Sequence, residues 1–500
     1  MEATLKTGLG NSNVLEWGKW KKFGFISAFL ALAVICLLPE QPGLSVAGQR
    51  MIGIMIFAVI LWSTSAVSYP VSAGLIMTLT ALFIGFSPGT NSDQIIGTSA
   101  GMKMALVGFS SPAFCLVGAA LFLAAAMTIT GLDKRIALFV LHKVGAEPKR
   151  IVLGVILCGL ILSFFVPSTT ARVACLVPIV IGVIQALNLP MKSAFAAALM
   201  ITVAQVDSVW NIGIKTAAAQ NMVAVNFIRE ITGTDITWMN WFIAAAPFAA
   251  LLSVCLFFLV CKCFNVDSTK LESSSEIIGV RLRELGPMSK NEWKLLIVSL
   301  ILLSFWTSEK TLHQIDTTTT TVCAIAILMC PGIGVMNWQQ TVNKINWGTL
   351  LLFGVGISLG SALLSTKAAQ WLADMIVLSF GLENSTTFMI LAVMAIFLIV
   401  IHLGFASATG LAAAIIPIII AVLGALKTPG VNIIGLTMIL QFVISFGYIL
   451  PVNAPQNMIA YSTGTFEVSQ FAKFGLMFTL VAYGLLLFLA QTYWKWLGLV

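Results

Sequence analysis

Long apolar runs alternate with short polar segments along almost the whole chain. A helical run of about 18–25 apolar residues can cross a hydrocarbon core of roughly 30 Å. No water satisfies backbone polar groups there, so the crossing segments are expected to be helices. Spans that change sides are predicted near residues 23–38, 51–68, 70–86, 112–130, 193–228, 239–261, 294–308, 317–335, 348–366, 430–463 and 470–494.

Two further apolar stretches, 151–187 and 387–426, are each interrupted at the centre by a small polar tip. The first contains VPSTTARVACLVPI and the second FASATGLAAAIIPI, so both carry Ser-x-Thr and then a Pro-Ile pair. A stretch that turns back at its tip is a re-entrant hairpin and does not change sides. The pattern therefore predicts an all-α polytopic membrane protein with about 11 transmembrane helices plus two re-entrant hairpins.

Composition supports a membrane protein. Hydrophobic residues make up 59% of the chain, charged residues 9%, and the mean hydropathy is +1.00. An average soluble domain is about a quarter charged, so this chain could not maintain a water-soluble surface. The nine cysteines imply no disulfide framework. The three histidines form no HExxH motif, and no other catalytic set is evident, so an enzyme is not expected.

The formal net charge of +8 is explained by topology rather than by a nucleic-acid partner. With the N-terminus inside, eighteen of the 27 Lys and Arg residues fall on cytoplasmic stretches and seven fall outside. The remaining two, Arg172 and Lys215, fall within the membrane. This asymmetry predicts a cell-membrane protein with a cytoplasmic N-terminus and an external C-terminus. Reading both interrupted stretches as full crossings gives the same asymmetry, so charge alone does not establish the hairpins.

The two halves repeat each other beyond the tips. The segment KTAAAQNMVA (215–224) follows the first tip and PVNAPQNMIA (451–460) follows the second, so Gln-Asn-Met occurs twice in the same order. The hairpins start from opposite sides in the predicted topology, which makes the repeats inverted, as in many secondary transporters. Small, polar or Pro residues interrupt the spans 193–228 and 430–463, which predicts broken helices beside the tips.

This organisation divides the chain into five parts. They are the N-terminal scaffold spans 1–130, the first transport repeat 131–261 with its hairpin 151–187 and broken helix 193–228, a cytoplasmic linker 262–293, the second-half scaffold spans 294–385, and the second transport repeat 386–500 with its hairpin 387–426 and broken helix 430–463.

The tips are candidate anion sites. Each leaves unpaired N–H groups at the start of a returning helix, which favours negative charge. Ionisable groups within the membrane are functional candidates by default, and Arg172 could hold a carboxylate through two hydrogen bonds. Structural alternatives remain open: Asp207 and Lys215 could neutralise each other, Arg172 could tether its hairpin to carbonyls, and His402 could be a packing residue or a proton carrier. The hydroxyl tips could also serve only to pack helices.

At these residues the chain resembles the divalent anion:sodium symporter (DASS) family of di- and tricarboxylate transporters. The resemblance runs from GLDKRIALFVLHKVG (131–145) through both tips to LPVNAPQNMIAYSTG (450–464). It implies an elevator-type carrier, usually a homodimer, that binds a small carboxylate anion at the tips. Carried over to this sequence, the substrate-binding residues are Ser168, Thr169, Thr170, Arg172, Lys215, Asn221, Ser407, Thr409, Pro455 and Asn457. The coupling ion would be sodium, near Ser168, Thr169, Gly213, Ala406, Thr409 and Asn453; no other cofactor is expected.

The tips also depart from the family pattern, which usually has Ser-Asn-Thr. Thr169 and Ala408 replace the two asparagines, and Ala408 supplies no side-chain oxygen for sodium. Arg172 and Lys215 bring fixed positive charge to the same region. The resemblance is closest to the branch of 2-oxoglutarate/malate and citrate/succinate translocators. The expected function is therefore exchange of di- or tricarboxylates, with sodium-coupled symport, or transport of an inorganic divalent anion, as alternatives.

Overall fold

A computed structural model describes residues 18–89, 92–145, 147–266, 275–426, 428 and 430–500. The helices are α1 (Lys19–Leu37), α2 (Val46–Thr64), α3 (Tyr69–Leu79), α4 (Thr98–Leu106), α5 (Pro112–Thr130), α6 (Leu132–Val144), α7 (Pro148–Phe165), α8 (Thr169–Ala186), α9 (Ala194–Gly213), α10 (Ala219–Thr232), α11 (Trp238–Cys263), α12 (Ser275–Glu284), α13 (Lys290–Ser308), α14 (Thr317–Met329), α15 (Trp338–Val342), α16 (Trp347–Ser365), α17 (Ala368–Phe380), α18 (Thr387–His402), α19 (Ala408–Ala425), α20 (Ile433–Ile444), α21 (Pro455–Tyr461), α22 (Val468–Gln491) and α23 (Tyr493–Trp496). A π-helical turn, η1 (Thr80–Ile84), extends α3, and short 3-10 turns occur at η2 (Val107–Ser110), η3 (Lys215–Ala217), η5 (Leu382–Asn384) and η6 (Pro451–Asn453).

The prediction of a polytopic, nearly all-helical membrane protein is confirmed. Ten helices in the described part of the chain are long and apolar enough to cross a membrane. The β structure there is a two-stranded antiparallel ribbon of β1 (Pro88–Gly89) and β2 (Ser92–Ile95) and an isolated bridge between Glu309 and His313, none of which was predicted. The short helices α4, α6, α12 and α17 were also not predicted, because a search for long apolar runs overlooks helices of about three turns. The predicted linker 262–293 includes 267–274, which lie outside the described residues.

The first interrupted stretch doubles back at its tip. On α7, Gly154 contacts Leu141 in the C-terminal half of α6. On α8, Gly182 contacts Arg281 of α12, and α12 packs along α6. Gly154 and Gly182 lie fourteen residues before and after Ser168, yet both reach the same group of helices. The helices α7 and α8 are therefore the two antiparallel arms of a hairpin.

The second interrupted stretch closes in the same way. Thr428, just beyond the end of α19, donates its hydroxyl to the carbonyl oxygen of Ser385, just before α18, at 3.3 Å. A hydrogen bond between the two ends requires the chain to turn back between them, so α18 and α19 form the second hairpin. Both returning arms contain an internal proline, Pro178 in α8 and Pro417 in α19.

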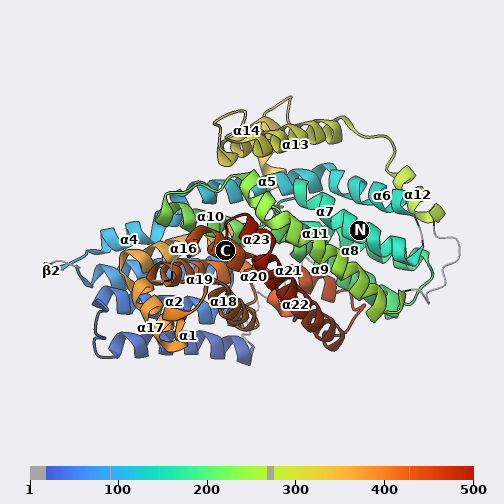
Figure 1. The fold of residues 1–500 in the computed structure, drawn as a ribbon. Coiled ribbons are helices and arrows are strands. Elements are labelled where there is room, and N and C mark those ends of the chain that lie inside the picture. Colours follow the sequence, from blue (N-terminus) through green and yellow to red (C-terminus); the bar gives the residue numbers. More distant parts are fainter. Residues whose placement is uncertain (1–17, 90–91, 146, 267–274, 427, 429) are drawn as a thin grey trace, which may run out of the picture.

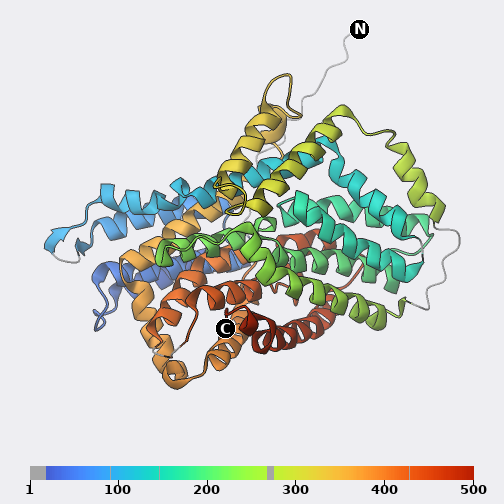
Figure 2. The same ribbon diagram turned by 45° about the horizontal axis from the view of Figure 1, so that its top comes forward.

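Each predicted broken helix is indeed two helices. Residues 193–228 form α9 and α10 with η3 between them, and residues 430–463 form α20 and α21 with η6 between them. In Figure 1, the first hairpin, α9 and α11 lie together at one end of the molecule, while α2, α4, α16 and α17 lie at the other. Figure 2 shows the same separation, with the blue N-terminal helices far from the teal first hairpin. The elements α19, α20 and α21 lie between these groups (Figure 1).

Candidate functional site

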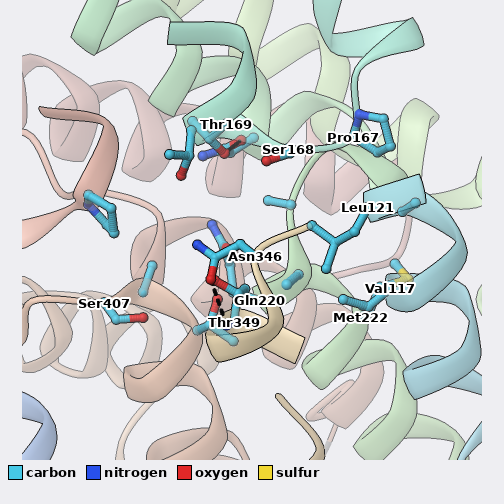
Figure 3. A pocket seen from close by; sticks show the side chains of 18 of the residues that line it. Val117, Leu121, Pro167, Ser168, Thr169, Gln220, Met222, Asn346, Thr349 and Ser407 are labelled. Carbon is cyan, nitrogen blue, oxygen red and sulfur yellow. Dashed lines mark hydrogen bonds between the residues drawn. The ribbon is translucent and has the colours of Figure 1, made fainter. Parts of the chain in front are cut away.

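Both hairpin tips line one cavity of about 100 Å³. The starts of α10 and α21 line the same cavity, so four helices begin there. The lining residues from these four starts are Ser168, Thr169, Thr170, Ser407, Ala408, Thr409, Ala218, Ala219, Gln220, Ala454, Pro455 and Gln456. Figure 3 shows Ser168 and Thr169 on one side of the cavity and Ser407 on another. The tips, which are more than two hundred residues apart in sequence, are thus brought together.

The two tips have nearly the same conformation. Ser168 precedes α8 with φ −144° and ψ 111°, and Ser407 precedes α19 with φ −152° and ψ 119°. Each serine caps its helix: Ser168 Oγ accepts from the Ala171 amide, and Ser407 Oγ accepts from the Gly410 amide. A cap satisfies one of the free N–H groups of the first turn and leaves others exposed at the positive end of the helix.

The two helix breaks also match. Ala218 and Ala454 are extended residues with almost equal angles, φ −150° and ψ 142° against φ −149° and ψ 139°. Asn221 Nδ2 donates to the Asn211 carbonyl at 2.6 Å, and Asn457 Nδ2 donates to the Gly447 carbonyl at 2.7 Å. Each asparagine thus satisfies a carbonyl that the break leaves free.

Glutamine contacts between the halves reveal the relation of the repeats. Gln220 donates to Ser445 Oγ at 3.4 Å, and the matching Gln456 donates to Ser208 Oγ at 3.1 Å. Residue 220 of one repeat corresponds to 456 of the other, and 208 corresponds closely to 445. Such reciprocal contacts are the signature of a two-fold relation, here within one chain. The repeats are therefore related by a pseudo-two-fold axis that passes close to the cavity.

Arg172 lies behind the first tip and not in the cavity. Its side chain is fully buried. All five of its N–H groups have acceptors. Two are side-chain oxygens, the Asp207 carboxylate at 2.8 Å and Asn211 Oδ1 at 2.7 Å. The other three are the backbone carbonyls of Val166, Ala217 and Asp207, at 2.8, 3.2 and 3.2 Å. A guanidinium has five donors and no more. Arg172 therefore has no donor left for the expected contact with a substrate carboxylate.

The second tip is held differently. Asn453, in the break of the second half, donates Nδ2 to the carbonyls of His402, Leu403 and Phe405 at 2.9, 3.3 and 3.2 Å. Its Oδ1 accepts from the Leu450 amide at 3.1 Å. A neutral amide thus occupies the carbonyl cluster behind the second tip, where the first tip has a guanidinium. The buried ring of His402 has no hydrogen-bond partner among the described residues.

Lys215 also lies outside the tip cavity. Its Nζ donates to the Ile236 carbonyl at 2.6 Å, and the side chain lines a separate cavity of about 380 Å³ with Arg229, Glu309 and Lys310. The suggested neutralisation of Asp207 by Lys215 is wrong, because the partner of Asp207 is Arg172.

The structure divides the predicted site residues into two groups. Those that line the cavity are Ser168, Thr169, Thr170, Ser407, Thr409 and Pro455. Those that do not line it are Arg172, Lys215, Asn221, Asn457, Gly213, Ala406 and Asn453. In each Gln-Asn pair the glutamine lines the cavity, whereas the asparagine that was predicted to bind substrate donates to a carbonyl at the break.

Sequence reasoning missed the opposite wall of the cavity. Its apolar part comes from α5, through Leu116, Val117, Ala120 and Leu121. Its polar part comes from Tyr69 of α3 and from Asn346 and Thr349 at the start of α16. Figure 3 shows Val117 and Leu121 on one side, with Asn346 and Thr349 near the centre. No repeat or motif marks these residues, so the sequence held no signal for them.

Comparison with known proteins identifies the family. The family described as "Sodium:sulfate symporter transmembrane region" matches residues 19–500. A "Membrane protein" of Cupriavidus necator is 50% identical over 480 residues, covering 96% of this chain and 93% of that protein. The "Citrate/succinate antiporter" of Escherichia coli K12 is 24% identical and covers 94% of this chain and 96% of its own length.

Among solved structures, the YdaH transporter of Alcanivorax borkumensis has a similar fold, with a TM-score of 0.58 at 13% identity. The match covers 87% of this chain and 98% of that one. The resemblance to the divalent anion:sodium symporters is confirmed by the family match over residues 19–500. The chain is therefore a multi-pass membrane transporter, not an enzyme, and it belongs to the sodium:sulfate symporter transmembrane family.

Proposed function

We propose that this transporter exchanges aliphatic di- or tricarboxylates across the cell membrane without a requirement for sodium. One arrangement carries the proposal: two matched helix starts share one cavity, and a fixed guanidinium fills the oxygen cluster behind the first of them. The helix starts account for the class of substrate. The guanidinium accounts for the coupling.

A substrate with two separated negative ends suits the cavity. The first turns of α8 and α19 each present free N–H groups and a partial positive charge. The hydroxyls of Thr170 and Thr409 line the same cavity as further donors. A dicarboxylate can use both tips at once, whereas sulfate or phosphate concentrates its charge at one centre. The paired tips therefore favour a carboxylate with two ends over an inorganic anion.

The donors that occupy the carbonyl oxygens behind the tips support exchange. Sodium in secondary transporters is commonly bound by the carbonyl oxygens of interrupted helices. In this chain, Arg172 binds three such carbonyls behind the first tip, and Asn453 binds three behind the second. Asp207 balances the charge of Arg172, so what matters here is that these carbonyl oxygens already have donors. Oxygens that are occupied in this way are not free to bind sodium, which supports exchange over sodium-coupled symport.

The relatives support the same reading. The Escherichia coli protein that matches over nearly the whole chain is named a citrate/succinate antiporter. The alternative is sodium-coupled symport, which the description of the family favours. Thr169, Thr409 and the remaining backbone carbonyls are the oxygens that a sodium ion would use in that case.

Counterflow in proteoliposomes tests the proposal. Vesicles that contain the purified protein are loaded with unlabelled succinate, and uptake of labelled succinate is measured with sodium or with choline outside. We expect rapid uptake in both media, and little uptake into vesicles loaded with buffer alone. Uptake that needs an inward sodium gradient but no internal dicarboxylate would instead establish symport. Competition by citrate, malate, 2-oxoglutarate, tartrate and sulfate ranks the substrates.

The wider organisation belongs to the same proposal. We propose that the repeats 131–261 and 386–500 move as a transport unit against the scaffold segments 1–130 and 294–385, with 262–293 as the cytoplasmic linker. The carrier is expected to be an elevator-type homodimer with a cytoplasmic N-terminus and an external C-terminus. Cross-linking in membranes tests the dimer, and labelling of single cysteines placed near residues 19 and 495 from either side tests the orientation.

A further inference from the structure

The wall opposite the four helix starts is mostly apolar. The helix α16 also begins at the cavity, but it belongs to this wall and not to the hairpins or breaks that supply the four starts. The wall residues of α5 offer no polar side chain. Polar groups on this wall come from Tyr69, Asn346 and Thr349. A charged substrate held by the tips therefore meets only a few groups here that could discriminate between anions.

Asn346 is oriented by its role as the cap of α16. Its Oδ1 accepts a hydrogen bond from the Thr349 amide at 3.1 Å. This bond assigns the two ends of the side-chain amide, because an N–H can donate only to the oxygen. Nδ2 therefore points away from the helix start, and the described residues provide no hydrogen-bond acceptor for it. Figure 3 shows Asn346 in the middle of the cavity, between the first tip and Thr349.

The position of Asn346 differs from that of its counterpart in the first half. Ser111 caps α5 in the equivalent way, through a bond from the Phe114 amide at 3.1 Å. Ser111 does not line the cavity, which instead contacts α5 one to three turns further along, from Leu116 to Leu121. The cavity thus meets the polar beginning of α16 but the apolar middle of α5. The pseudo-symmetry of the tips does not extend to the wall.

We propose that Asn346 is a specificity-determining residue whose side-chain N–H groups bind a carboxylate of the substrate from the wall side. This inference rests on the proposed transport of carboxylates and adds a ligand that neither tip nor break supplies. Nδ2 carries two donors and no charge, so it binds an anionic oxygen without a large desolvation cost. Its contact selects substrates that turn a carboxylate oxygen toward α16, in addition to the carboxylate oxygens held by the tips.

Asn346→Asp is the direct test, because the two side chains have the same shape. Aspartate is an equally good helix cap, so the bond from the Thr349 amide is retained and α16 keeps its start. The substitution replaces two donors by a negative charge. At a separation of about 5 Å and an effective dielectric constant of about 20, the repulsion between two carboxylates weakens binding roughly 250-fold. We therefore expect the KM for succinate to rise by about that factor.

Asn343→Asp is the matched control. Asn343 lies one turn before Asn346 in the sequence, is exposed, and does not line the cavity. It receives the same charge on the same segment, so it reports any general effect of a new carboxylate near α16. A second variant, Asn346→Ser, keeps a capping oxygen but removes the N–H groups. Loss of a hydrogen bond to a charged partner predicts a KM increase of about ten-fold for it.

The measurement is counterflow of labelled succinate, with KM and the maximal rate determined for the wild type and the three variants. A large rise in KM for Asn346→Asp, with Asn343→Asp unchanged, supports the proposal. Equal KM values for the two aspartate variants overturn it, as does a fall in the maximal rate alone. If the wild type exchanges no carboxylate, the proposed function itself fails. If the wild type exchanges succinate normally and Asn346→Asp does too, only this inference fails.

Discussion

Replacement of Arg172 by lysine separates a structural role from a substrate-binding role. The change keeps the positive charge but substitutes an ammonium with three donors for a planar guanidinium with five. In the structure, all five donors of Arg172 are used, and all their acceptors belong to the protein. At least two acceptors must therefore lose their partner in Arg172→Lys. The lysine side chain is also shorter, so it cannot span from Val166 to Asp207.

The size of the effect follows from these bonds. A hydrogen bond with a charged partner contributes about 1.5–3 kcal/mol, so the loss of two costs about 3–6 kcal/mol. Removal of the Asp207 charge is expected to cost a similar amount, about 3–5 kcal/mol, because it leaves Arg172 buried without its counter-ion. Arg150→Lys is the control: Arg150 and Glu147 form an exposed pair, and such pairs contribute about 0–1 kcal/mol.

The assay measures stability and transport on the same preparations. Thermal unfolding of the detergent-solubilised protein is followed with a thiol-reactive dye, which the buried cysteine Cys158 makes suitable. We expect a much lower Tm for Arg172→Lys than for Arg150→Lys, and an unchanged KM in the protein that remains folded. A normal Tm together with a raised KM would refute this reasoning and would return Arg172 to the list of substrate ligands.

Three further predictions test the tips, the start of α13 and the packing of α10 against α16. Thr170→Ala and Thr409→Ala each remove a cavity hydroxyl, and each should lower succinate transport about ten-fold. Burial alone would raise the pKa of Glu292, but hydrogen bonds from an arginine of α6 and from its own helix cap outweigh it and hold the pKa below 4.5. Ionised Glu292 therefore stabilises the fold above pH 4.5. The Tm of the wild type should exceed that of Glu292→Gln at neutral pH, and this difference should shrink as the pH falls through the lowered pKa. Gly360→Ala places a methyl group against Phe227, and we expect a clear loss of Tm and of transport.

Each of these predictions has a contradicting result. Near-normal transport by both threonine variants would remove the tips from the binding site. A difference in Tm between wild type and Glu292→Gln that stays constant from pH 7 to pH 3 would show that the ionised carboxylate is not the source of the stabilisation. Gly118→Ala serves as the control for Gly360→Ala, since a Cβ at Gly118 meets its nearest neighbour at an ordinary 3.8 Å. Equal behaviour of the two alanine variants would contradict the argument from packing.

The class of fold and the places where helices stop can be read from the sequence alone. Hydropathy is a property of each run, so the spans, the stretches 151–187 and 387–426, and their tips could be read without knowledge of contacts. The repeated Ser-x-Thr and Gln-Asn-Met segments are local as well, and they predicted that two tips and two breaks belong to one arrangement. Short helices such as α6 were not predicted, because a mixture of apolar and charged residues over three turns is not distinctive.

Which side chains meet depends instead on how the helices pack. Arg172 and Asp207 are 35 residues apart, and the choice of Arg172 over Lys215 as the partner of Asp207 depends on how the first hairpin packs on α9. The helical phase at each break turned the glutamines toward the cavity and the asparagines toward free carbonyls. Asn346 entered the site because α16 begins opposite the tips. A buried polar group must find a partner, but the sequence does not say which of the distant candidates comes within reach.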